Sequence, residues 1–241
     1  MAHRYFLTAV DGDKAFVTGD EAAHLAKVMR LKPGDCVTLT DGAGFDYKCT
    51  AKEVTPREVI FHIREKFPNP AEPKKQLTVF MALPKSDKLE FICQKSCELG
   101  AVNFVPFVSE FCVAQKSKKD DAKTRRLQKI SDEACKQCGR SKPMAVAPTA
   151  TFKQILPMLK GFDKVILLYE QGAKPLNSVD FTNREKVAVI IGSEGGFSQK
   201  EADEMSAAGR ENILLGNRIL RCETAAVAGT ALVMYRLGEM N

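Results

Sequence analysis

Three prolines within six residues, Pro68, Pro70 and Pro73, divide this chain of 241 residues into two parts with different hydrophobic patterns. Proline lacks a backbone N–H, so such a segment cannot continue a strand ladder and favours an interdomain linker. Before it, apolar residues alternate with polar ones and are broken by turn signals such as Asp41-Gly42-Ala43-Gly44. After it, short apolar runs alternate with amphipathic stretches of ten or more residues. The chain is expected to fold as two domains, residues 1–72 and 73–241.

The first part is expected to be a small β-barrel or sandwich. A helix is predicted over residues 20–31, with Asp20 as N-cap and Pro33-Gly34 ending it. The predicted strands cover residues 4–10, 36–40, 45–54 and 58–67. The second part is expected to be α/β, with a sheet covered on both faces. Its predicted strands cover residues 77–83, 102–108, 164–169, 187–191 and 212–215, and its predicted helices 87–99, 121–138, 152–159, 198–208 and 223–237.

The composition is that of an ordinary globular protein, with 44% hydrophobic and 27% charged residues. These values exclude disorder, collagen and coiled coil as the main state. No apolar run reaches the roughly 20 residues that a membrane helix needs, and no signal-peptide pattern follows Met1. A cytoplasmic protein with no membrane partner is therefore expected.

Eight cysteines raise the question of a metal site. Cys135 and Cys138 form a C-x-x-C pair, and Cys93 and Cys97 lie one helical turn apart, so a four-thiolate zinc site can be drawn. Both pairs fall inside amphipathic helical patterns, where a cysteine is usually a small buried hydrophobe. Because the chain also has only three histidines, no metal site is expected.

Positive charge is concentrated in the middle of the chain. The net charge is +6, and residues 74–148 hold 15 basic and 8 acidic side chains, whereas the flanking parts are nearly balanced. A run of lysines and arginines is often the solvated face of a helix, and that alternative stays open. A local excess beside balanced neighbours is also what binding an extended polyanion requires, so nucleic acid is the expected partner.

A glycine-rich loop follows one predicted strand: Ile191-Gly192-Ser193-Glu194-Gly195-Gly196-Phe197-Ser198. Sheets of this class bind ligands at the carboxyl ends of their strands, and glycines allow a ligand to approach the backbone closely. The loop lacks the lysine of a P-loop and the spacing of a dinucleotide motif. Its Glu194 would repel phosphate but suits ribose hydroxyls or a cation. A plain turn into a helix capped by Ser198 and Glu201 is the alternative.

A second loop, residues 215–225, links the last predicted strand to a helix that is rich in small residues. The small residues would let a neighbouring helix or a second subunit approach closely. Arg218 and Arg221 lie near Glu223, and a surface ion pair between them is one interpretation. Because the loop follows a strand and contains Gly216, the arginines are more simply interpreted as substrate-binding groups.

Residues 191–198 and 215–225 resemble the two hallmark segments of the RsmE family, the small-subunit ribosomal RNA uridine N3-methyltransferases of the SPOUT superfamily. Further similar stretches are Arg4-Tyr5-Phe6, His24 with Arg30 and Gly34, residues 88–100, and residues 133–140, so the resemblance covers nearly the full length. The chain departs from the family where Ser193 and Asn217 replace a common proline and Cys222 replaces a common threonine. These changes remove no ionisable group.

The resemblance implies an N-terminal PUA-like β-barrel that binds RNA and an α/β methyltransferase domain whose C-terminal end forms a trefoil knot. It also implies S-adenosylmethionine as cofactor, small-subunit ribosomal RNA or the assembled subunit as partner, and a homodimer with the active site near the interface. Spacing alone would have argued against a knot, because threaded chains are very rare.

The resemblance and the loops together predict the site residues. The predicted catalytic residues are Arg221 and Arg140, which would stabilise a uridine anion, and Glu194, near the cofactor's ribose or sulfonium. Glu98, Glu133 and Glu223 are candidate proton acceptors, among which the sequence does not select, and bulk water is the alternative. The predicted cofactor-binding residues are Leu168, Tyr169, Glu170, Gly192, Glu194, Gly195, Gly196, Leu215, Gly216, Ile219, Leu220, Arg221, Thr224 and Ala225. The predicted RNA-binding residues are Arg4, His24, Arg30, Lys116, Lys118, Lys119, Arg125, Arg126 and Arg140.

Two alternative functions stay open at this point. A related knotted methyltransferase that acts on a ribose 2′-hydroxyl or another base would share the cofactor loop, and only a mapped product would separate the two. A non-catalytic RNA-binding or ribosome-assembly factor would keep the fold, and cofactor binding by the purified protein would separate it from an enzyme.

Overall fold

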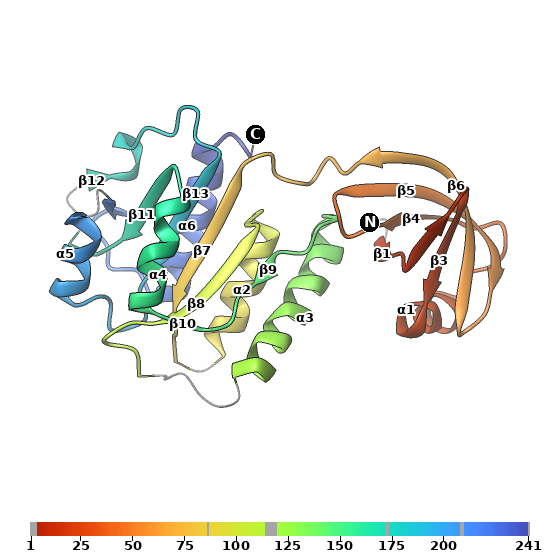
Figure 1. Cartoon of the computed structure of the whole chain (residues 1–241), viewed down its shortest axis with the longest axis horizontal. Coiled ribbons are helices and arrows are strands. Elements are labelled where there is room, and N and C mark those ends of the chain that lie inside the picture. The colour runs from red at the N-terminus through yellow and green to blue at the C-terminus, as the bar shows by residue number, and fades with distance from the viewer. Residues whose placement is uncertain (1–3, 86, 114–119, 172–173, 208–209, 241) are drawn as a thin grey trace. The chain divides into compact units, whose positions relative to one another are not determined.

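The computed structural model describes residues 4–85, 87–113, 120–171, 174–207 and 210–240 (Figure 1). The chain divides into two compact units: Met1–Glu72 with Cys135–Pro143, and Pro73–Ala134 with Met144–Asn241. The division after Glu72 lies in the proline-rich segment. Residues 135–143, however, group with the first unit rather than with the second, where the sequence places them.

The first unit contains a six-stranded sheet in the order β1-β4-β5-β6-β3-β2. The β1–β4 pair is parallel and the other pairs are antiparallel. Its apolar core includes Leu25, Leu39 and Phe61, all fully buried. The elements are β1 (Arg4–Phe6), β2 (Ala9–Asp11), β3 (Lys14–Thr18), α1 (Gly19–Ala23), a π-helix (His24–Val28), β4 (Cys36–Thr40), β5 (Phe45–Val54) and β6 (Glu58–Pro68).

The structure corrects the predicted N-terminal elements in three places. The strand predicted over 4–10 is two strands, because β1 pairs with β4 whereas β2 pairs with β3. Strand β3 is absent from the prediction, although Ala15 and Val17 alternate with more exposed residues and are fully buried against the core. The predicted helix ends earlier than residue 31, at the π-helix and a left-handed Arg30.

Residues 135–143 pack against the first unit through a buried polar network. The Asn69 amide donates to the buried Asp46 carboxylate at 2.9 Å and to the Gly139 carbonyl at 3.0 Å. The Glu72 carboxylate accepts hydrogen bonds from the backbone N–H groups of Ser141 and Lys142, both at 2.7 Å. These bonds satisfy polar groups that would otherwise be buried without partners, which explains why this segment belongs to the first unit.

The second unit is α/β, which confirms the predicted class. Its sheet runs in the order β10-β8-β7-β13-β11-β14-β12, with β9 paired to β8, and the strand pairs among the described residues are parallel. Central strands β7 and β13 are buried along nearly their whole length, as expected of strands covered on both faces. The strands are β7 (Gln76–Ala82), β8 (Asn103–Val108), β9 (Ala145–Val146), β10 (Ala150–Thr151), β11 (Lys164–Leu168), β12 (Lys174–Pro175), β13 (Lys186–Ile191) and β14 (Glu211–Leu214).

Helices cover this sheet as the sequence predicts, within two residues at each end. They are α2 (Lys88–Glu98), α3 (Asp120–Cys138), α4 (Phe152–Met158), α5 (Gln199–Ala207) and α6 (Cys222–Arg236). Helices α2 and α6 pack together, and α6 also packs on β7 and β13, whereas α4 packs on β8 and β10 (Figure 1). None of the helices that the structure describes is long and apolar enough to cross a membrane.

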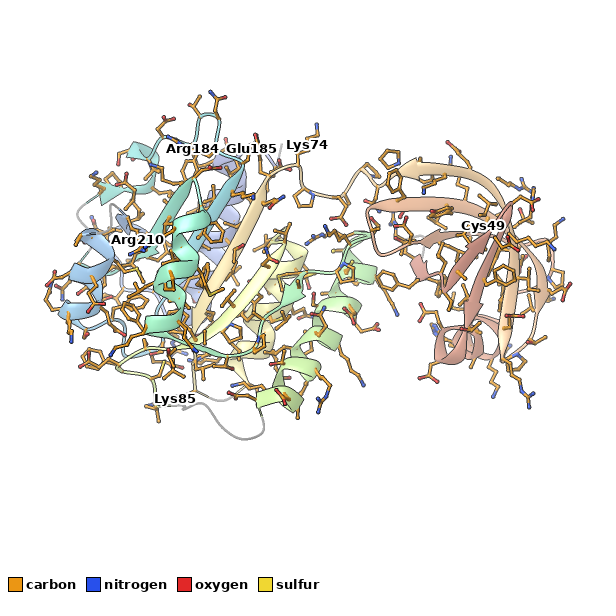
Figure 2. The ribbon with its side chains drawn as sticks, viewed as in Figure 1. Cys49, Lys74, Lys85, Arg184, Glu185 and Arg210 are labelled. Atoms are coloured by element: carbon orange, nitrogen blue, oxygen red, sulfur yellow. The ribbon has the colours of Figure 1, made fainter. Side chains whose placement is uncertain are left out.

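The two ends of the parallel strands, here called the amino-terminal and carboxyl-terminal edges of the sheet, differ in the segments that lie there. At the amino-terminal edge the Glu239 carboxylate accepts hydrogen bonds from the backbone N–H groups of Lys74 and Lys75, both at 3.0 Å, which ties the chain after α6 to the start of β7. Figure 2 places Lys74 and Glu185 at this edge and Lys85 at the opposite one. The carboxyl-terminal edge carries the glycine-rich loops.

Candidate active site

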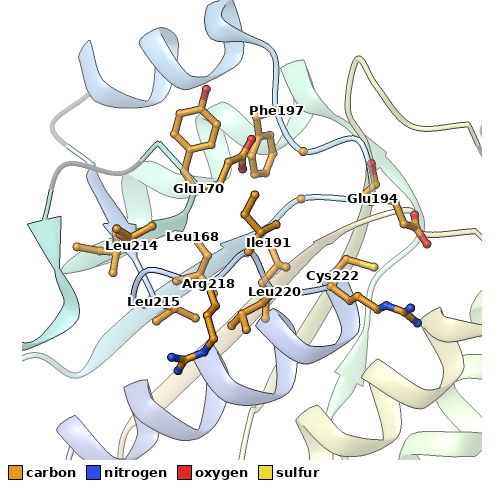
Figure 3. Close-up of a pocket in the computed structure, with 18 of the residues that line it drawn as sticks. Leu168, Glu170, Ile191, Glu194, Phe197, Leu214, Leu215, Arg218, Leu220 and Cys222 are labelled. Carbon is orange, nitrogen blue, oxygen red and sulfur yellow. The ribbon is translucent and has the colours of Figure 1, made fainter.

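Three neighbouring parallel strands end at the same level and bring three loops together. Leu168 of β11 pairs with Ile191 of β13 and with Ile213 of β14, so the residues that follow all leave the sheet at its carboxyl-terminal edge. Between these loops lies a cavity of about 650 Å³. Figure 3 shows Leu168, Ile191 and Leu220 toward its middle and Arg218 extending from its rim.

The first loop is tightly packed, and each of its glycines is needed for space. A Cβ on Gly195 would lie 2.8 Å from the Phe111 Cβ, and one on Gly192 would lie 3.1 Å from the Phe197 ring. Gly196 has a φ of 68°, and its N–H donates to the Ser193 carbonyl at 3.0 Å. The loop is therefore a pre-formed turn whose shape larger residues would change.

The helix after this loop begins with the predicted capping box. The Ser198 N–H donates to the Glu201 carboxylate at 3.1 Å, and the Glu201 N–H donates to the Ser198 hydroxyl at 3.3 Å. The same carboxylate accepts a hydrogen bond from the Glu110 N–H at 2.9 Å. The capping box thus also joins the glycine loop to the segment after β8, which carries Phe111.

The second loop is open to solvent. Gly216 has a φ of 88°, a Cβ added to it would have no atom within 4 Å, and Ile219 is 88% exposed. Arg221 caps the start of α6 in an extended conformation, and its side chain and that of Arg218 line the cavity. Among the residues that the structure describes, no ion pair involves either arginine. The ion pair of Glu223 is with Lys88, so the surface pair between these arginines and Glu223 is not formed.

A charged cluster lies at the rim of the cavity. The Lys88 ammonium is 2.9 Å from the Glu194 carboxylate and 3.1 Å from that of Glu223. These hydrogen bonds, led by that to Glu194, raise the pKa of Lys88. Partial burial acts to raise the pKa of Glu194, but the hydrogen bonds from Lys88 and from the Lys85 N–H outweigh it and leave that pKa below its usual value. Glu194 is therefore a carboxylate at neutral pH.

The inner wall of the cavity is apolar, with one polar atom left over. Leu168, Tyr169, Ile191 and Phe197 are buried, and Tyr169 meets the Phe197 ring edge to face. The Ser193 hydroxyl is buried and has no hydrogen-bond partner among the described residues, so it is available to a ligand. A buried polar group of this kind is costly unless it is satisfied.

Helix α6 sets the floor of the cavity. A Cβ on Gly229 would overlap the Leu168 side chain, so only glycine lets the helix approach the end of β11 this closely. This contact explains one of the small residues of the helix, which serves packing within the second unit.

Nearly all of the predicted cofactor-binding residues line this one cavity. They are Leu168, Tyr169, Glu170, Gly192, Glu194, Gly195, Gly196, Leu215, Gly216, Ile219, Leu220, Arg221 and Ala225, whereas Thr224 is not among the lining residues. Sequence reasoning assigned no role to Lys88 or Cys222 and considered Phe197 only for stacking on a base, and all three also line it. Phe197 and Cys222 stand next to assigned residues, but Lys88 is 106 residues from Glu194 and carries no motif of its own.

The predicted RNA-binding residues of the first unit differ in solvent exposure and in ion pairing. His24 and Arg30 are exposed, and Arg30 has a φ of 52°, a conformation that a non-glycine residue rarely adopts. The Arg4 guanidinium instead pairs with the buried Asp46 carboxylate at 3.0 Å, and its side chain is only 22% exposed.

Helix α3 carries two predicted RNA-binding arginines, both exposed at the surface. Arg125 has no ion pair among the described residues, whereas Arg126 pairs with Glu90 of α2 at 2.8 Å. The remaining lysines of the basic block, Lys116, Lys118 and Lys119, lie outside the described residues.

Arg140 lies in the first unit and is not among the residues that line the cavity. Its side chain is 3% exposed, and its guanidinium pairs with Glu72 at 3.2 Å. The structure thus places it in the polar network that holds residues 135–143. The candidate proton acceptors Glu98, Glu133 and Glu223 are also absent from the lining.

Cys93, Cys97 and Cys135 are buried, and Cys138 is partly buried. The Cys93 and Cys97 thiols point at carbonyls of α3, those of Leu127 and Ser131, and burial raises the pKa of Cys93. Among the described residues no group of three or more histidine, cysteine or acidic side chains is placed to hold a metal ion.

Comparison with known proteins identifies the family of the chain. Residues 71–234 match the family described as RNA methyltransferase domain, and residues 17–64 match an RNA methyltransferase PUA domain. The chain belongs to the RNA methyltransferase family. It is 31% identical to ribosomal RNA small subunit methyltransferase E of Bacillus subtilis, with 91% of this chain and 89% of the relative covered. It is 32% identical to the protein of that name from Mesomycoplasma hyopneumoniae, with 93% and 96% covered. The resemblance to the RsmE family is thereby confirmed.

Solved methyltransferase structures share the fold over nearly the whole chain. A ribosomal RNA small subunit methyltransferase E from Neisseria gonorrhoeae, bound to S-adenosyl methionine, superposes with a TM-score of 0.85 at 25% identity, with 98% of each chain covered. A methyltransferase from Legionella pneumophila in complex with the same cofactor gives a TM-score of 0.86 at 25% identity, again with 98% of each chain covered.

Proposed function

We propose that this protein methylates the N3 atom of a uridine in small-subunit ribosomal RNA in the cytoplasm, with S-adenosylmethionine as methyl donor. The single observation that carries the proposal is the cavity at the ends of β11, β13 and β14. In a chain of this family, two glycine-rich loops meet there with Arg221, which has no ion pair among the described residues.

The residues of the cavity fit S-adenosylmethionine better than a nucleotide phosphate. Leu168, Ile191 and Leu220 offer an apolar wall for the adenine, and the Ser193 hydroxyl offers an unused hydrogen bond within the described structure. The carboxylates of Glu170 and Glu194 suit ribose hydroxyls or the positive groups of the ligand and would repel phosphate. When bound, this cofactor supplies an electrophilic methyl group on a positively charged sulfur.

The chain itself must make the uridine reactive. The N3 of uracil carries a proton between two carbonyls and is a poor nucleophile until that proton leaves. Arg221 would hold the negative charge that spreads to the carbonyl oxygens, because a guanidinium stays charged and donates in a planar fork. Arg140 is buried in the polar network of the first unit, so the proposal assigns the uridine anion to Arg221 alone. The solvent-accessible cavity leaves water as the proposed proton acceptor.

RNA engagement is proposed to use His24 and Arg30 of the first unit together with Arg125 and Arg126 of α3. All four side chains lie at the surface. The lysines at 116, 118 and 119 add to this set of basic side chains from their place in the sequence. The target base must also leave any stack before its N3 can be reached.

The proposed homodimer would use the face formed by α2 and α6. Phe91 is 47% exposed, Leu232 is 44% exposed and Tyr235 is 60% exposed, which is unusual for large apolar side chains on two packed helices. Leu232→Glu should shift the protein toward monomer in analytical ultracentrifugation. Met158→Glu is the matched control, because Met158 is equally exposed but lies on α4. An unchanged sedimentation coefficient for Leu232→Glu would argue against this interface.

The threaded C-terminal knot also stays a proposal.

The direct test is nucleoside mass spectrometry on ribosomal RNA from cells that lack this protein. RNA and isolated small subunits are incubated with the purified protein and S-adenosylmethionine that carries a labelled methyl group. We expect label in 3-methyluridine. Label in a 2′-O-methyl nucleoside or another base would favour a related methyltransferase instead, and a protein that binds no cofactor would be an RNA-binding factor.

A further inference from the structure

Lys88 lies between two carboxylates at the rim of the cavity. Its ammonium is 2.9 Å from Glu194 and 3.1 Å from Glu223, and the Cys222 thiol donates to the same Glu223 carboxylate at 3.3 Å. The three charged residues come from separate segments: the start of α2, the glycine loop and the first turn of α6. One side chain thus connects both loops of the cavity.

This arrangement bears directly on Arg221. Arg221 precedes Glu223 by two residues, is the N-cap of α6 and lines the same cavity as Glu194. A guanidinium within reach of an unpaired carboxylate ordinarily pairs with it. In the described part of the chain both carboxylates pair with Lys88, and neither pairs with Arg221.

We infer that Lys88 is a positioning residue for methyl transfer, which engages Glu194 and Glu223 so that the Arg221 guanidinium stays free for the anionic base. The inference deepens the proposed function and rests on it, because it needs a substrate that develops negative charge. Lys88 touches neither the base nor the methyl group in this account. It acts by pairing with the two carboxylates that would otherwise be available to Arg221.

A simple structural tether would use the same contacts, so the test must separate the two roles. Lys88→Met should lower kcat about tenfold or more, because Glu223 is then free to pair with Arg221. Adding Glu223→Gln to Lys88→Met should restore most of the lost kcat, since the carboxylate two residues from Arg221 is then gone, while Glu194 still accepts the hydrogen bond of the Lys85 N–H. A tether predicts the opposite, because the double variant has lost both ion pairs of Lys88 and would be as slow as the single variant or slower.

The measurements are kcat and KM for RNA, with cofactor affinity by calorimetry and folding by circular dichroism. Lys88→Arg keeps the charge and both pairings and should remain within about threefold of the unmodified protein. Lys88→Gln replaces the methionine variant if that variant does not fold, with the same expected rescue. A Lys88→Met protein with unchanged kcat, or a double variant without recovery, would overturn the inference. An unmodified protein that transfers no methyl group to RNA would instead overturn the proposed function.

Discussion

The two loops that enclose the cavity differ in glycine content and in packing: residues 191–198 contain three glycines, whereas residues 215–225 contain one. At residues 192, 195 and 196, added Cβ atoms would meet Phe197, Phe111 and the Glu170 carboxylate, so each of the three glycines is confined. Around residues 215–221, Gly216 faces empty space and Ile219 is 88% exposed. Both loops follow parallel strands of one sheet, yet only the first is held by its surroundings.

The difference indicates that the two loops have separate roles, one for the packed loop and one for the exposed loop. A loop that is already packed loses little conformational entropy when a small cofactor binds, which favours pre-organised recognition. A loop with exposed arginines and an exposed isoleucine keeps surface that a larger partner such as RNA can contact. We therefore expect changes in the first loop to affect the cofactor and changes in the second to affect RNA and turnover.

The largest expected effect is that of Arg221→Ala in the open loop. Turnover on small-subunit RNA should fall about 10²–10³-fold, the usual loss when one donor to a developing anion is removed. Cofactor affinity by calorimetry should stay nearly unchanged, because the packed wall is intact. Near-normal turnover would remove Arg221 from the mechanism, and a lost cofactor affinity would erase the contrast between the loops.

Next in size is a pair of matched changes, Gly195→Ala and Gly216→Ala. The new methyl group at 195 must displace Phe111, and overpacking of this kind costs about 1–3 kcal/mol, so cofactor affinity should fall roughly tenfold. The methyl group at 216 meets no neighbour, and the cost there is backbone strain at a φ of 88°, which lowers the melting temperature more than the affinity. Calorimetry measures the cofactor affinity of both variants, and thermal melts measure their stability. Equal losses of affinity would contradict the expected difference between the two loops.

A smaller effect is expected for Arg218→Ala. If the open loop faces RNA, removing one phosphate contact should lower the salt slope of RNA binding by about 0.7–0.9. Lys153→Ala is the control, because Lys153 is an exposed cation on α4. Fluorescence anisotropy at several salt concentrations measures both. Identical slopes for the two variants would mean that Arg218 only faces solvent.

The smallest expected effect is the pH dependence of Glu194→Gln. The pKa of Glu194 is lowered in the folded protein, so its ion pair adds stability above the ordinary carboxyl pKa near 4.5 and loses it as the pH falls through the lowered value. A partly exposed pair contributes at most about 1 kcal/mol, or roughly 2–4 °C in melting temperature. The unmodified protein should melt higher at pH 7, and the difference should vanish in acid. A difference independent of pH would mean that the charge is irrelevant.

Local patterns were enough to predict much of this molecule. Ser198 and Glu201 form the capping box that their spacing predicts, and the main strands and helices of the second unit lie within two residues of their predicted bounds. The cavity also follows from local reasoning, because parallel strands bring their following loops to one edge. The failures are non-local. Strand β3 has an alternating pattern of only five residues, and its place in the sheet is set by pairing with β2 and β6. The roles of Arg140 and Lys88 depend on partners 68 and 106 residues away.

The sequence by itself determined the α/β class, the proline-rich boundary and the two glycine loops, because periodicity, proline and glycine act over a few residues. Only the tertiary structure decided which charges are free. In the folded chain Arg140 is buried and pairs with Glu72, and Lys88 pairs with both Glu194 and Glu223. Arg221 has no ion pair among the described residues. Ion pairs depend on distances of a few ångströms between segments far apart in the chain, and no local pattern encodes those distances.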